Sequence, residues 1–111
     1  MTVELNTKNN MVKFSAELSR KMKLKVHSPV MVFKIKGKDA YGFKKVDEKF
    51  IGEMQLGFAE GGRVKSIHSL APTPILMLTT LGYIDEKKTL EVKEGTIENT
   101  GEKFYYIGET L

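Results

Sequence analysis

The sequence has no cysteine, only three prolines and no long uninterrupted hydrophobic run. Without cysteine the chain can form no disulfide, no thiolate nucleophile and no cysteine-based zinc site, and a reducing compartment is permitted. Its most apolar stretch, residues 70–84, contains Pro72 and Pro74 and is too short to cross a bilayer of about 30 Å. The first ten residues are polar and lack an apolar signal core. We therefore expect a cytoplasmic protein with no membrane partner.

Residues that carry enzyme chemistry are also sparse. His27 and His68 are the only histidines, and neither has a second histidine at a metal-ligand spacing. Both precede a serine, and we interpret them as polar loop residues. The segment EGGRVKS, residues 60–66, lacks the glycine and lysine spacing of loops that wrap phosphates. We therefore expect no enzyme, no catalytic residue, no metal site and no cofactor.

The charge of the chain is unevenly distributed. With 111 residues, 41% of them hydrophobic and 29% charged, the sequence is typical of one globular domain spanning residues 1–111. Residues 1–45 hold eleven Lys or Arg against three acids, a balance of +8, whereas residues 46–111 hold seven against eleven, a balance of −4. A basic half joined to an acidic half indicates either a face that binds polyanions or two halves that attract each other.

Hydrophobic periodicity predicts short strands and two short helices. Ser15 is a candidate N-cap for a helix that ends near Leu24, and Thr73 with Pro74 predicts a second helix closed by Gly82. Gly42, inside a predicted strand, is a candidate β-bulge. The paired glycines at 61–62 predict a hairpin turn. The predicted strands are 2–6, 11–14, 30–36, 40–46, 63–68, 88–94 and 103–108.

The order strand, helix, strand, strand occurs twice, in units of about 11–46 and 62–108. A shift of 59 residues places Met77 over Leu18 and Leu81 over Met22, and it places Leu90 over Met31. Apolar matches at both helical and strand spacing favour an internal repeat.

The second unit resembles the AbrB and MraZ-like DNA-binding domains, the swapped-hairpin superfamily. The resemblance lies in a Gly-Arg-aliphatic strand, a short helix that ends in Leu-Gly, and a strand of alternating aliphatic residues. The matching positions are Gly62, Arg63, Val64, Ile67, Leu78, Leu81, Gly82, Leu90 and Val92. The first unit is similar through Val12, Phe14, Leu18, Met22, Leu24, Val30 and Val32, although Asn10-Met11 replaces Gly-Arg.

The resemblance implies a fold in which the hairpins of two copies interlock, and basic residues on strands and loops meet DNA. We therefore expect an α+β, mainly β protein in which two tandem β-α-β-β units form one small swapped-hairpin or barrel-like domain. Since one chain supplies both copies, it can fold as its own pseudo-dimer, and a homo-oligomer is also possible. The implied function is that of a small, non-enzymatic transcriptional regulator that binds duplex DNA.

Basic residues of the first unit and of the Gly-Arg strand are the candidate DNA-binding positions. Only Arg20 and Arg63 are arginines, and lysine suits backbone contacts better than base readout. The candidate set is Arg20, Lys21, Lys23, Lys25, Lys34, Lys36, Lys38, Arg63 and Lys65.

Two alternative interpretations stay open. The lysines can instead form a solvated face that keeps a small protein soluble. The segment 75–81 is apolar on more than one helical face, which indicates a helix central to the core or one shared with another subunit. The alternative function is a structural or protein-interaction module, such as a phage or mobile-element accessory protein, that assembles through this helix.

Overall fold

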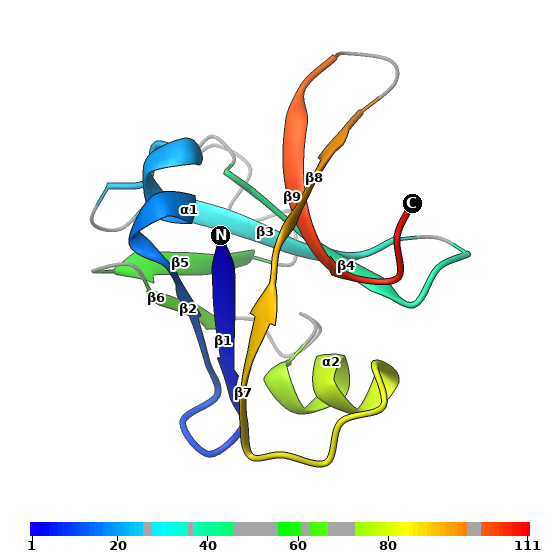
Figure 1. The fold of residues 1–111 in the computed structure, drawn as a ribbon. Coiled ribbons are helices and arrows are strands. Elements are labelled where there is room, and N and C mark those ends of the chain that lie inside the picture. The colour runs from blue at the N-terminus through cyan, green and yellow to red at the C-terminus, as the bar shows by residue number, and fades with distance from the viewer. Residues whose placement is uncertain (26–27, 36, 46–55, 61–62, 67–72, 98–100) are drawn as a thin grey trace.

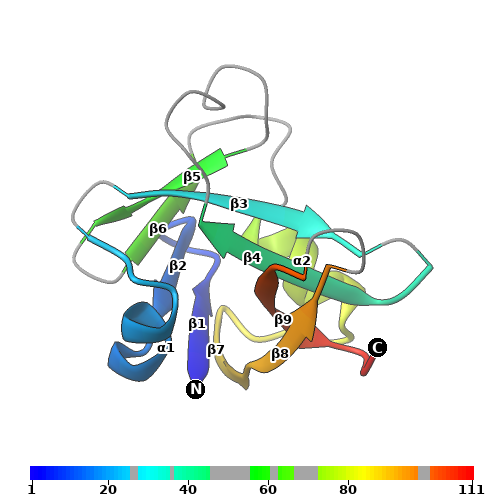
Figure 2. The same cartoon turned by 90° about the horizontal axis from the view of Figure 1, so that it is seen from above.

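A computed structural model describes residues 1–25, 28–35, 37–45, 56–60, 63–66, 73–97 and 101–111. These residues form strands linked by short turns, with two short helices that lie apart from each other (Figures 1 and 2). The elements are β1 (Thr2–Asn6), β2 (Met11–Phe14), α1 (Ala16–Lys21), β3 (Ser28–Lys34), β4 (Ala40–Lys45), β5 (Leu56–Glu60), β6 (Arg63–Ser66), α2 (Pro74–Thr80), β7 (Lys87–Glu91), β8 (Lys93–Thr96) and β9 (Lys103–Gly108). The expected mainly β chain with two short helices is confirmed.

All described strands belong to one antiparallel sheet in the order β7-β1-β2-β6-β5-β3-β4-β9-β8. The β1–β2 hairpin pairs with β7, and the β5–β6 hairpin pairs with β3. Among the described strands, the two remaining pairings between the halves of the chain are β2 with β6 and β4 with β9. The hairpin predicted around residues 61–62 is confirmed by the pairing of Glu60 with Arg63.

The strand predicted at residues 88–94 differs in the structure. The single strand expected at 88–94 is divided at Val92, because its first half pairs with β1 and its second half with β9. β7 and β8 are therefore the two edge strands of the sheet, although they are successive parts of one segment of the chain. They do not pair with each other within the described residues, so the strands of the expected swapped-hairpin or barrel-like domain do not close into a barrel there.

One hydrophobic core joins the two halves of the chain. Strand alternation turns Val3 and Leu5 of β1 inward, and the helices add Leu18 and Met77, all of them fully buried. The same cluster contains Val12, Phe14, Met22, Val30, Val32, Tyr41, Phe43, Leu78, Val92, Tyr105 and Ile107. Since burying one large apolar side chain contributes about 1.5–3 kcal/mol, this cluster is the main source of stability.

A second, smaller cluster covers the outer side of the β3–β4 and β8–β9 hairpins. The Phe104 ring lies 5.7 Å from that of Phe33 and 5.9 Å from that of Tyr106, measured between centroids. The register through Gly42 is regular, so the predicted bulge is wrong. A Cβ at Gly42 would lie 2.3 Å from the Phe33 ring, so glycine here makes room for an aromatic neighbour.

The two helices have matching ends. The Ser15 and Thr73 hydroxyls accept hydrogen bonds from backbone N–H groups at the helix starts, as predicted. Each helix ends in a Schellman motif, with Lys23 (φ 56°) or Gly82 (φ 86°) in the left-handed conformation. The backbone bonds Leu24 to Ser19 and Lys23 to Arg20 recur 59 residues later as Tyr83 to Leu78 and Gly82 to Thr79.

Replacing Lys23 with glycine should stabilise the protein by about 0.5–1 kcal/mol. A side chain in the left-handed conformation costs roughly 1–2 kcal/mol, and the extra freedom of glycine in the unfolded chain offsets only part of the gain. Urea denaturation measures the change. As a control, Lys21→Gly within α1 should lower stability by about 1 kcal/mol, and a loss of stability in Lys23→Gly would contradict the strain assigned to Lys23.

Candidate nucleic-acid interface

A cleft lies where the end of α1, the end of β4 and the start of β9 come together. We call it the basic cleft; it has a volume of about 290 Å³ and is lined by Lys21, Met22, Lys44, Lys45, Glu102, Lys103 and Tyr105. Phe43 and Tyr105 form the last described pair of the β4–β9 ladder, so Lys44 and Lys45 follow it beside Lys103. Met22 and Tyr105 are buried, and Lys21, Lys45 and Lys103 are exposed.

Within the part of the chain that the structure describes, four ammonium groups and one carboxylate line the basic cleft. The Lys44 Nζ donates to Glu102 Oε2 at 2.5 Å. The Lys103 Nζ lies 3.2 Å from Glu94 Oε1, outside the lining. The Lys45 Nζ donates to the Lys23 carbonyl at 2.9 Å. Because a carbonyl group carries no net charge, this hydrogen bond does not compensate the positive charge of Lys45. Lysines that line one cleft create a positive potential that attracts anions.

The predicted DNA-binding residues fall into separate groups. Arg20 and Lys21 lie on the last turn of α1, and Lys23 and Lys25 follow in the chain. Of these four residues, Lys21 lines the basic cleft, and the Lys23 carbonyl accepts from Lys45. Lys34 and Lys38 lie at the opposite end of the β3–β4 hairpin, where the Lys34 Nζ donates to the Lys38 carbonyl. There the Lys38 Nζ lies 3.7 Å from Glu109 Oε1, and the carboxylate partly compensates the lysine charge.

The remaining candidates lie on β6 or outside the described residues. Arg63 is paired with Lys13 of β2, and Lys65 is paired with Met11, so three basic positions lie close together along these two strands. Lys36, together with His27 and His68, lies outside the part of the chain that the structure describes.

The structure adds three lysines that the candidate set does not contain. Lys44 and Lys45 lie on the predicted hairpin, but only the fold shows which end of it faces α1. Lys103 comes from the far end of the chain and joins the cleft through the β4–β9 pairing. No local signal could have found Lys103, because its proximity to α1 depends on a long-range strand pairing.

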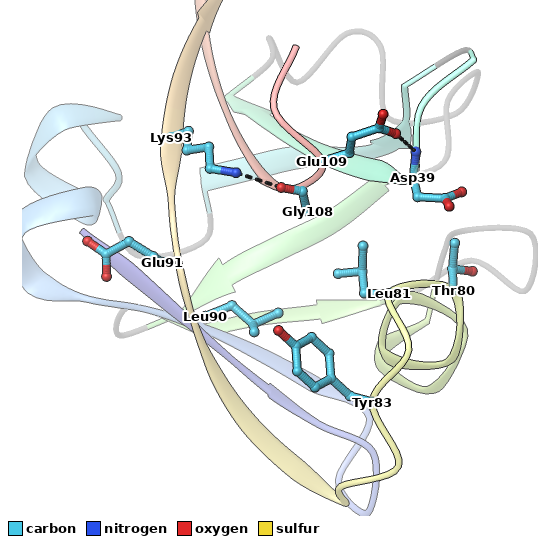
Figure 3. A pocket seen from close by; sticks show the side chains of 9 residues that line it. All are labelled: Asp39, Thr80, Leu81, Tyr83, Leu90, Glu91, Lys93, Gly108 and Glu109. Atoms are coloured by element: carbon cyan, nitrogen blue, oxygen red, sulfur yellow. Dashed lines mark hydrogen bonds between the residues drawn. The ribbon is translucent and has the colours of Figure 1, made fainter.

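A second cleft lies at the other end of the β4–β9 ladder, between the end of α2 and β7–β8 (Figure 3). We call it the acidic cleft; its volume is about 440 Å³, and it is lined by Asp39, Thr80, Leu81, Tyr83, Leu90, Glu91, Lys93, Gly108 and Glu109. The Asp39 N–H donates to Glu109 Oε2 at 3.0 Å. The Lys93 Nζ donates to the Gly108 carbonyl at 2.6 Å. Three carboxylates therefore share this cleft with one ammonium group.

The described part of the chain contains no group of three or more His, Cys, Asp or Glu side chains that could hold a metal ion. Neither described helix is long and apolar enough to cross a membrane. Comparison with known proteins finds no matching family model, no matching curated protein and no matching solved structure.

Proposed function

We propose that this protein is a non-enzymatic, AbrB/MraZ-like regulator that binds duplex DNA through its phosphate backbone. The observation that carries the proposal is the gathering of lysines from α1, β4 and β9 around the basic cleft, next to Arg20, Lys23 and Lys25. Lysine ammonium groups neutralise phosphates without reading base edges, so affinity comes mainly from charge.

The proposal includes two tandem units with exchanged hairpins. The pairing order supports it: the first hairpin, β1–β2, adds to β7 of the second half, and β5–β6 adds to β3 of the first half. β7 and β8 are successive parts of one segment and can be counted as one element. When β1, β2, β3 and β4 are then exchanged with β5, β6, β7–β8 and β9, each element keeps the same kind of neighbours in the sheet. The helix-end hydrogen bonds that recur 59 residues apart give independent support.

A protein-interaction module is the second candidate function. Ile75 and Leu76 on α2 are 62% and 51% exposed, and Ile84 just beyond the helix is fully exposed. Apolar side chains grouped on one surface favour association with another protein surface. A molecular mass that rises with protein concentration, without retention on DNA, would support this candidate over DNA binding.

Salt-dependent binding of a short fluorescent DNA duplex tests the first proposal. If four lysines each neutralise one phosphate, affinity should fall by about 100-fold between about 50 and about 200 mM salt. Fluorescence anisotropy at several salt concentrations gives the slope. No binding at low salt, or binding that does not change with salt, would contradict DNA binding through the backbone.

A further inference from the structure

The basic cleft and the acidic cleft occupy corresponding places in the two halves of the chain. Lys21 and Met22 at the end of α1 correspond to Thr80 and Leu81 at the end of α2, at the shift of 59 that relates the helix-end hydrogen bonds. Each cleft is completed by the end of one strand of the β4–β9 ladder and the start of the other. Because these strands are antiparallel, the two clefts lie at opposite ends of the same ladder.

The two clefts carry different charges at several corresponding positions. The end of β4 supplies Lys44 and Lys45, whereas the end of β9 supplies Gly108 and the following Glu109. The start of β9 supplies Lys103, where β4 begins with Ala40; the residues before the two strands, Glu102 and Asp39, are both carboxylates. One framework thus holds four ammonium groups and one carboxylate at one end, and three carboxylates and one ammonium group at the other.

We infer that the basic cleft is a phosphate-binding site, and that the chain binds DNA from this end alone; the inference rests on the proposed function. Apart from Glu102 and Tyr105, the polar side chains of the lining are ammonium groups, which donate hydrogen bonds and accept none. A phosphodiester of the DNA backbone accepts hydrogen bonds and donates none, and its negative charge complements the positive charge of the lysines. The carboxylates of the acidic cleft repel the same ligand.

Glu102 is the internal competitor of the phosphate. Among the described residues its carboxylate is the only acid in the lining, and it holds Lys44 by the 2.5 Å hydrogen bond. A phosphate that binds to Lys44 must replace this contact. Removing the negative charge of Glu102 therefore frees an ammonium group inside the cleft and removes repulsion of the ligand at the same time.

Glu102→Gln should tighten the binding of both inorganic phosphate and the DNA duplex by about fivefold at low salt, as expected for one close charge contact that is exposed to water. The matched control is Glu109→Gln in the acidic cleft, which changes the net charge equally and keeps an acceptor for the Asp39 N–H. Its affinity should change less than twofold. Phosphate titration followed by amide chemical shifts should move Lys44, Lys45 and Lys103 along one saturating curve.

Equal gains in the two variants would overturn the inference, because net charge alone would then explain them. Duplex binding without any phosphate-dependent shift at the cleft would overturn the phosphate site and leave the proposed function standing. Saturable phosphate shifts at the cleft without duplex binding would support the site and reject DNA as its ligand. Lys45→Met provides a second variant: it should weaken phosphate binding, and unchanged binding would also overturn the site.

Discussion

Reversing the charge of Lys21 and Lys45 together should weaken binding to a short DNA duplex by about 100-fold at low salt. Both side chains are exposed and line the basic cleft from different elements, α1 and β4. Each substitution by glutamate removes a phosphate contact and adds a repelling charge. The slope of the logarithm of affinity against the logarithm of salt concentration should decrease in magnitude by about two, since two phosphate contacts are lost.

A control with the same change in net charge separates the cleft from the molecule as a whole. Lys8 follows β1 and Lys87 begins β7, and both lie at the end of the β1–β2 hairpin away from α1 (Figure 1). Lys8→Glu with Lys87→Glu should reduce affinity less than tenfold, because distant exposed charges are screened over a Debye length of about 8–10 Å. Equal losses in the two double variants would contradict a localised interface. Thermal unfolding of each variant establishes that its fold is kept.

Local sequence signals predicted the helices and most strands correctly because short-range chemistry determines them. Ser15 and Thr73 cap helices since their hydroxyls reach backbone donors three residues on, whatever the rest of the chain does. Gly82 was predicted to end α2 for the same local reason, and its φ of 86° confirms it. The division at Val92 could not be predicted, because it depends on which two strands lie on either side.

The candidate site was predicted only in part for a related reason. Arg20, Lys21, Lys23 and Lys25 are close in sequence and therefore stay close in the fold. The candidate set included Lys34 and Lys38 and left out Lys44 and Lys45, yet the pairing of β3 with β4 places the two pairs at opposite ends of one hairpin. Charge composition indicated a basic half, whereas only strand pairing determines which lysines share a cleft.

Truncating the buried helix residues Leu18 and Met77 should have the largest effects on stability. Both are fully buried in the same core cluster, and they occupy corresponding places on α1 and α2. Leu18→Ala and Met77→Ala should each reduce the free energy of unfolding by about 2–5 kcal/mol, through lost burial and the cavity left behind. Such losses are a large part of the roughly 5–15 kcal/mol that stabilises a typical domain.

Equilibrium urea unfolding measures these losses and also tests whether the halves form one cooperative unit. Since Leu18 and Met77 share a cluster, each variant should shift the midpoint of a single transition and leave its denaturant slope unchanged. Ile75→Ala is the matched control on α2, because Ile75 is 62% exposed and its truncation should change stability by less than about 0.5 kcal/mol.

Two separate transitions, with each truncation shifting only one of them, would contradict a shared core. They would also weaken the proposal of exchanged hairpins, because β1–β2 pairs with β7 of the other half and β5–β6 pairs with β3. The first hairpin of each half pairs with a strand of the other half. If one half unfolded alone, both halves would therefore lose strand pairing and expose their buried residues to water. A single transition in both variants is therefore the result that interlocked halves require.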